Sequence, residues 1–271
     1  MTAVAVTGSG RTDSDPQHGR HGALRLVAHQ VRYEQLSFWR NRQSAIFTFV
    51  FPVVFMAIMG ALFNGLGRTS YFYGLTALQY YLPTIAALSV LGSCYGQLAT
   101  VLAMRRQNGI LKRVRATPLP AWVYFTGLLA HCVVVSVVDI VLLTAVARLY
   151  GVPLPSDWLA IALALVLGAA SFCALGVAVA SLISNAEAAP AVAQLVLFPL
   201  LFLSGTYMPI HSATLNRVAG WLPVRPFNEA LTNVFARHAG PGWSNIGVLA
   251  VWGGLGAIVA IRRFRWNPRP E

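Results

Sequence analysis

The chain contains six long segments that are almost free of charged residues, and no other feature restricts its fold as strongly. A helix needs about 20 apolar residues to cross a bilayer, where every backbone polar group must be paired within the protein. We therefore predict an all-α polytopic membrane protein in which residues 44–261 form a six-helix transmembrane domain. The predicted spans lie at about 44–63, 80–104, 121–147, 158–183, 188–205 and 246–261.

The overall composition agrees with a lipid environment. Hydrophobic residues make up 56% of the 271 residues and charged residues only 10%, against about a quarter in soluble domains. The net charge of +12 would suit nucleic acid, but the basic residues cluster between apolar spans and no soluble domain carries a binding face. We therefore expect the lipid bilayer, and no nucleic acid, among the partners of this chain.

Two segments precede the first span. Residues 1–21 are polar and hold no apolar core of signal-peptide length, so we expect a disordered tail and no cleaved signal. Residues 22–43 predict an amphipathic helix at the membrane interface, although an ordinary solvated helix would show a similar pattern. The apolar positions of this helix are Leu24, Val27, Val31 and Phe38, with Trp39 close to the first span.

The distribution of basic residues predicts the orientation. Fifteen of the twenty Lys and Arg residues lie before the first span, after the second or after the sixth, and the other five lie in the alternate loops. Segments rich in Lys and Arg stay in the cytoplasm. We therefore expect a multi-pass protein of the cell (inner or plasma) membrane with both termini cytoplasmic, including the basic tail 262–271.

Residues with catalytic or ligand-binding chemistry are scarce. No GxxxxGK[ST] phosphate loop, GxSxG elbow or HExxH pair occurs, so we expect this chain to bind no cofactor. Cys94, Cys132 and Cys173 lack metal-type spacing and are interpreted as apolar packing residues. Asp139 lies deep in a span, where a carboxyl group is a candidate proton relay, a protonated group or a partner of Ser136.

The fifth span has local signals on both sides. Ser184 and Glu187 have the spacing of a capping box, which predicts that the fifth helix starts there. Residues 206–245 contain two apolar patterns of helical spacing, the second of them after Pro226. They predict two short amphipathic helices that rest on, or dip into, one membrane face.

The most cationic stretch, RRQNGILKRVRATPLP at 105–120, joins the second and third spans. Topology alone accounts for its charge, because arginines at span ends extend toward water. It does not account for the apolar residues Ile110, Leu111 and Val114 among the charges, or for the prolines that end a helix at 118 and 120. The pattern favours a short, stiff helix that docks on a cytoplasmic partner.

The sequence resembles the type-2 permease family, the membrane subunits of ATP-binding-cassette exporters for drugs, polysaccharides and lipids. The resemblance rests on the cationic stretch, on FWRNRQSAIFTFVFPVVFMAIMGALF across the first span, and on SNAEAAPAVAQLVLFPLLFLSGTYMP across the fifth. It extends over nearly the whole chain after residue 22. Residues 64–79 form a shorter outer loop than the family often has, so an external domain is missing there.

The resemblance implies two protein partners and three docking or capping elements. A separate cytoplasmic ATP-binding-cassette ATPase would bind ATP and Mg²⁺, and a second permease copy, identical or a close paralogue, would complete the pathway. The interfacial helix would be a second contact with the ATPase, and 206–245 an outer cap with Gly205, Pro209, Pro226 and Glu229. The implied coupling residues are Arg105, Arg106, Gly109, Leu111, Lys112, Arg113, Arg115, Thr117 and Pro118.

The expected function is ATP-driven export of a hydrophobic or amphipathic compound of the drug, lipid or glycan-lipid type. In this mechanism Arg106, Arg113 and Arg115 meet acidic or polar groups of the ATPase, and Gly109 permits close approach. The alternative is a small proton-coupled secondary carrier that uses Asp139. An intramembrane lipid-processing enzyme is less well supported, because no nucleophile–base pair is evident.

Overall fold

The structure is a computed structural model that describes residues 16–63, 65, 67–155, 157–183, 185–204 and 212–264. All regular structure within these ranges is helical, which confirms the predicted all-α class. The helices are α1 (Pro16–Arg40), α2 (Arg42–Phe63), η1 (Ser70–Phe72), α3 (Ala77–Leu91), η2 (Gly92–Gln97), α4 (Leu98–Gln107), α5 (Ile110–Arg115), α6 (Ala121–Leu149), α7 (Trp158–Leu182), α8 (Ala189–Leu203), α9 (Ala213–Gly220), α10 (Val224–Phe235) and α11 (Trp243–Arg263).

Five stretches of the described chain are long and apolar enough to cross a membrane: Arg42–Phe63, Ser70–Gln107, Ala121–Leu149, Trp158–Leu182 and Trp243–Arg263. The predicted fifth span is shorter than a full span. Its helix α8 has 15 residues, or about 22 Å at 1.5 Å per residue, against a hydrocarbon core of about 30 Å. The structure therefore supports a multi-pass protein but not six full-length spans.

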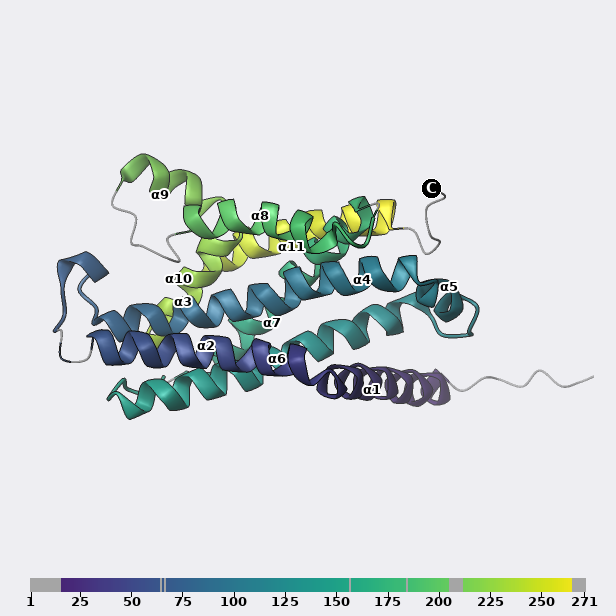
Figure 1. Ribbon diagram of the computed structural model, residues 1–271, viewed down its shortest axis with the longest axis horizontal. Coiled ribbons are helices and arrows are strands. Elements are labelled where there is room, and N and C mark those ends of the chain that lie inside the picture. The colour runs from purple at the N-terminus through teal and green to yellow at the C-terminus, as the bar shows by residue number, and fades with distance from the viewer. Residues whose placement is uncertain are drawn as a thin grey trace, which may run out of the picture.

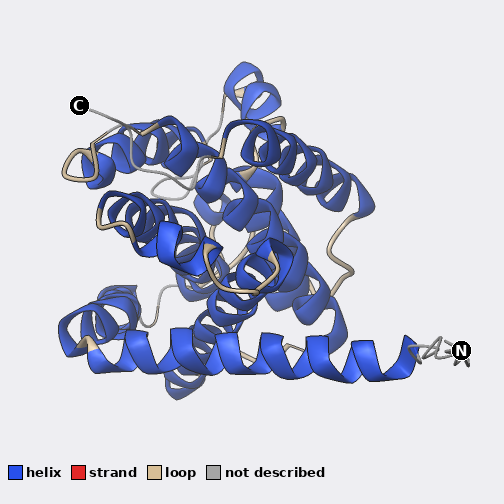
Figure 2. Cartoon of the chain, turned by 90° about the vertical axis from the view of Figure 1, so that its right-hand side faces the viewer, coloured by secondary structure: helices blue, strands red, loops and turns tan. Residues whose placement is uncertain are grey.

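The long helices α2, α3–η2–α4, α6 and α11 run along the long axis of the molecule (Figure 1). Helix α5 and the described C-terminal end of α11 lie at one end of this bundle, and α9 lies at the other. Figure 2 looks along the bundle from the α5 end and shows α1 lying across it. This direction is the one expected of an interfacial helix, whose place at the membrane surface stays a prediction.

The N-terminal helix differs from its predicted bounds. It begins at Pro16 rather than at residue 22, while the rest of the predicted tail lies outside the described residues. It ends at Arg40, and α2 begins at Arg42, because the helical conformation is interrupted at Asn41. The Asn41 side-chain oxygen accepts a hydrogen bond from the backbone N–H of Ser44 at 3.3 Å, so this residue caps the start of α2.

Helix α7 forms the centre of the bundle and packs against α11, α4, α6 and α10. Glycines make these contacts close, since an added Cβ at Gly168 would lie 2.2 Å from the Phe227 ring and one at Gly256 would lie 2.9 Å from the α7 backbone. In membranes, where lipid is as apolar as a side chain, such close packing holds helices together. Gly176 also lies against the backbone of η2.

Candidate functional site

The cationic stretch forms a helical cap between α4 and α6. Helix α4 ends at Gln107, and Gly109 follows with φ +68°, a left-handed conformation that glycine adopts without strain. The six-residue helix α5 then crosses the end of the bundle (Figure 1). Leu111 is fully buried (0% exposed) in the main core, so this side chain holds α5 against the bundle.

The outer face of this cap is cationic and exposed. Lys112, Arg113 and Arg115 are all exposed, as are Thr117 and Pro118. Within the described ranges, no ion pair involves any of these three cations; the ion pairs found there are those of Arg105 and Arg225. Part of the predicted coupling set therefore forms a surface that is available to an anionic partner.

Arg105 does not belong to that surface. Its guanidinium donates to both carboxylate oxygens of Glu34 on α1, at 2.8 and 2.6 Å, and to the Tyr124 hydroxyl on α6, at 3.0 Å. Glu34 is 3% exposed and Arg105 15% exposed. Bidentate Arg–carboxylate pairs are strong and directional. Arg105 therefore joins α1, α4 and α6, and its part in coupling to an ATPase stays a prediction.

Arg106 is also turned inward, with 4% of its surface exposed. Its guanidinium donates to the carbonyl oxygens of Ala180, at 3.0 Å, and of Ile183. These carbonyls end α7, where the helix dipole favours a cation. The side-chain oxygen of Gln107 accepts from the backbone N–H of Ala186 at 2.8 Å. The Arg106 guanidinium thus binds the C-terminal end of α7, and its expected contact with the ATPase stays a prediction.

The predicted interfacial residues divide between a packed face and an exposed one. Val27, Val31 and Phe38 are partly buried, and Phe38 lies edge-on to His131 of α6 with ring centroids 5.4 Å apart. Leu24 is 69% exposed, and Trp39 is also exposed, so neither belongs to the buried face of α1.

Gly127 of α6 allows α1 to pack closely against that helix, because an added Cβ at this position would lie 2.4 Å from the Gln30 side chain. Sequence reasoning missed Glu34. It is the one acidic residue among the basic and apolar residues of α1, and that isolation was the available signal.

A cavity of about 940 Å³ lies between the C-terminal part of α1, α2, α3–η2–α4, α6 and α8. Near α5 its wall is polar and includes Glu34, Arg105 and Asn108. Farther from α5, aromatic rings line it, and these are Phe47, Phe51, Phe55 and Phe198. The arrangement can hold a molecule with a polar and an apolar part.

Asp139 is buried on α6 and does not bond to Ser136. It accepts a hydrogen bond from the Ser89 hydroxyl of α3, and Ser89 also lines the cavity. The other carboxylate oxygen, Oδ1, has no partner among the described residues. Ser136 instead lies 3.7 Å from the Cys94 sulfur.

Local signals around α8 are only partly confirmed. The helix begins at Ala189 with Ala188 as its N-cap and no side-chain cap, so Glu187 precedes it and the capping-box prediction is wrong. Pro190 occupies the first turn, where a missing N–H costs little, and this explains the later start. Ser184 lies outside the described residues.

The two predicted late helices exist as α9 and α10. Helix α10 buries Phe227 and Pro226 within the bundle, and it packs on α3, α7 and α11. Its position relative to a membrane face stays a prediction. Glu229 pairs with Arg225 at 2.7 Å within the same helix. Gly205 and Pro209 lie outside the described residues, and the cap function of this segment stays a prediction.

Comparisons with known proteins agree with the geometry. Residues 26–236 match the model of the family described as ABC-2 type transporter. YvfS of Bacillus subtilis (strain 168), whose name describes a transport permease, is 24% identical over 221 residues, which cover 79% of this chain and 86% of that protein. The family match runs from α1 to the end of α10 and includes the cationic cap.

Proposed function

Because the chain belongs to the ABC-2 type transporter family and is a membrane permease subunit rather than an enzyme, we propose that it forms half of an export pathway. Two copies, or one copy and a close paralogue, enclose the pathway. A separate cytoplasmic ATPase, which binds ATP and Mg²⁺, drives it. Helix α5, α1 and both termini face the cytoplasm in this proposal.

The exposed cationic face of α5 carries this proposal. Lys112, Arg113 and Arg115 project from a short helix whose opposite side is held in the core by Leu111. A charged element with a fixed backbone suits docking, because complementary charges speed and orient association. Leu111 belongs to the coupling helix as its anchor, while the three cations make the contact.

Movement of α5 would reach most of the bundle through polar contacts. The Arg105–Glu34 pair joins the α4 end to α1, and Arg106 and Gln107 bind the linker between α7 and α8. When ATP closes the ATPase dimer, the docked helix shifts and these elements shift with it. The difference in ATPase affinity for the inward-open and outward-open states supplies the bias.

The cavity points to the class of cargo. Its aromatic wall suits an apolar chain or ring, and its polar part near Glu34 and Asn108 suits a hydrophilic group. The cargo is therefore an amphipathic or hydrophobic compound of the drug, lipid or glycan-lipid type.

Copurification with the ATPase tests the docking surface. The charge-reversal variant Arg113→Glu/Arg115→Glu should bind the ATPase at least about tenfold more weakly, which corresponds to about 1.4 kcal/mol. Stimulation of ATP hydrolysis by cargo in liposomes should fall with it. The matched control is Arg148→Glu, an exposed charge reversal at the far end of α6, which should bind normally.

If the double variant is monodisperse and binds the ATPase with normal affinity, the proposal that α5 is the docking element is refuted. Transport by the purified permease without an ATPase would remove the proposed function itself.

The proton-coupled carrier is the second candidate, and one observation favours it. The Asp139 carboxyl is hydrogen-bonded to Ser89, which lines the cavity, so a route for a proton from the cavity to a buried acid exists. Asp139→Asn should abolish transport in liposomes if protons drive the carrier. The variant should retain ATP-dependent transport if the ATPase drives it.

A further inference from the structure

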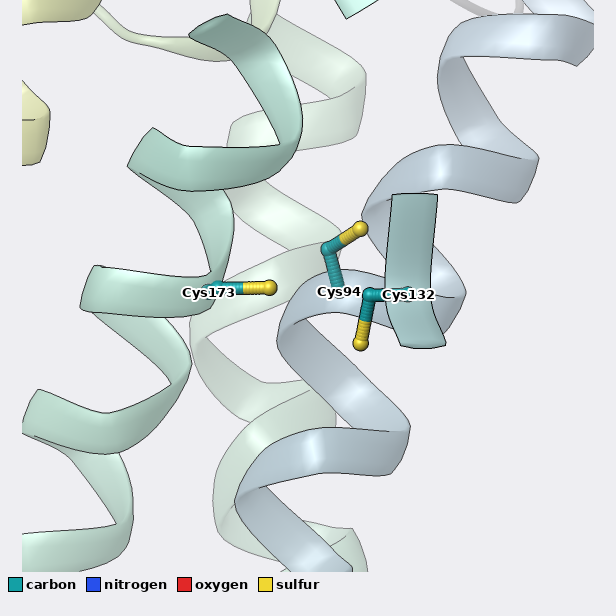
Figure 3. Close-up of side chains that lie close together, drawn as sticks. All are labelled: Cys94, Cys132 and Cys173. Carbon is teal, nitrogen blue, oxygen red and sulfur yellow. The ribbon is translucent and has the colours of Figure 1, made fainter. Parts of the chain in front are cut away.

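Three cysteines that are far apart in the sequence meet inside the bundle. Cys94 comes from η2, Cys132 from α6 and Cys173 from α7, and they are the three cysteines of the chain. All three are free and buried, and their sulfur atoms lie within 4.8 Å of one another. Figure 3 shows the sulfurs at the corners of a triangle, with that of Cys173 directed toward the other two side chains.

From this geometry we propose that the three cysteines bind a soft, thiophilic metal cation of low coordination number, for which Cu(I) is the best-suited probe. Thiolate sulfur selects Cu(I) and Zn(II) over harder cations. The three sulfurs lie within 4.8 Å of one another, so a cation at the centre of their triangle would lie no more than about 2.8 Å from each sulfur, against about 2.3 Å in zinc–thiolate bonds. An inward movement of each sulfur by at most about half an ångström closes that difference.

Two hydroxyl groups lie near the sulfur of Cys94. The hydroxyls of Ser93 and Ser136 lie 3.8 and 3.7 Å from the Cys94 sulfur, and 3.5 Å from each other. Such outer contacts orient metal ligands and stabilise their charged form. Cys94 also belongs to the π-helical segment η2, and π-helical turns are frequent at functional sites.

The cluster also borders the large cavity. Cys132 and Ser93 line that cavity, so a cation in it would be next to one of the three cysteines. Each thiol that coordinates as a thiolate exchanges its S–H bond for a metal–sulfur bond and releases one proton into the cavity. The metal keeps its oxidation state, so no oxidant or reductant takes part.

Cu(I) suits this cluster better than Zn(II) does. Structural zinc is four-coordinate and tetrahedral, whereas the cluster offers three sulfurs and no fourth His, Cys, Asp or Glu ligand among the described residues. A disulfide would join two of the sulfurs and leave the third without a role. This inference does not depend on the proposed transport function.

Titration of the reduced, detergent-solubilised chain with Cu(I), buffered by a chromophoric Cu(I) chelator, tests the site. We expect one Cu(I) per chain, and each of Cys94→Ser, Cys132→Ser and Cys173→Ser should weaken binding at least tenfold. The matched control Ser181→Ala, a buried change elsewhere on α7, should bind as the wild type does. Zn(II) in the same assay should compete more weakly.

X-ray absorption on the wild-type chain keeps the test decisive if a serine variant fails to fold. Three sulfur neighbours at about 2.3 Å would support the site. Two sulfurs, or nitrogen and oxygen neighbours, would overturn the three-cysteine assignment. Wild-type affinity in any single serine variant, or tighter binding of Zn(II) than of Cu(I), would refute the proposal in the same way.

Discussion

The buried pair between Glu34 and Arg105 is the most direct test of how the cytoplasmic-end elements are connected. Glu34→Gln keeps the shape of the side chain but removes the charge that neutralises Arg105. Removing one partner of a buried ion pair costs about 3–5 kcal/mol, because the remaining charge is left uncompensated. Arg105 keeps the Tyr124 hydroxyl at 3.0 Å and lines the cavity, so we expect the low end, about 3 kcal/mol.

The assay is thermal unfolding of the detergent-solubilised protein. For a domain of this size, about 3 kcal/mol lowers Tm by about 6–12 °C. Arg105→Gln should cost a similar amount, because it leaves the buried Glu34 carboxylate without its cation. The double variant should cost less than the sum of the two single variants, since neither charge then remains alone.

A coupling energy of at least about 1 kcal/mol is expected from this double-mutant cycle. Additive effects of the two substitutions, or a loss below about 0.5 kcal/mol for Glu34→Gln, would refute the reasoning. Such a result would mean that water in the cavity solvates the pair. Because this pair joins α1 to α4, the variants should also expose α1 to proteolysis.

Three further substitutions test other contacts. Gly109→Val should destabilise the turn before α5 by about 1–2 kcal/mol, because φ +68° is a left-handed conformation that costs a residue with a Cβ atom this much. ATP-driven transport should fall, while membrane insertion, measured by fractionation, should stay normal. Leu111→Ala should cost about 2–5 kcal/mol by cavity formation and should reduce coupling although every cation remains. Arg106→Gln should make the α7–α8 linker more mobile, which would be measured as faster hydrogen exchange at Ile183 and Ala186. Unchanged exchange would contradict the inference that Arg106 fixes this linker.

Several features of the fold were predictable because they depend on local composition. The apolar segments predicted α2, α6, α7 and α11 well, since the bilayer requires a helix of fixed length wherever charge is absent. The alternation of charged and apolar residues predicted α5 in the cationic stretch. This reasoning failed for α8. The apolar sequence continues beyond the ends of that helix, and the position at which the helix starts depends on Pro190.

The roles of single polar residues were decided by tertiary structure. Arg105, Arg106 and Arg113 are alike in the sequence, yet the first pairs with Glu34, the second binds the end of α7, and the third is exposed. The sequence does not show which helices pack against one another, so it cannot show which charged side chains are buried and which are exposed. Only packing showed which arginines remain available to a partner.

The sequence by itself determined that this chain spans a membrane, where its long apolar helices α2, α6, α7 and α11 lie, and which segments carry the positive charge. These properties follow from transfer free energies, which each segment carries independently of the others. The tertiary structure decided which side chains meet: the clamp on the α7–α8 linker, the cavity and the cluster of Cys94, Cys132 and Cys173. These contacts depend on how helices that are far apart in the sequence pack against one another, and no local sequence pattern encodes that packing.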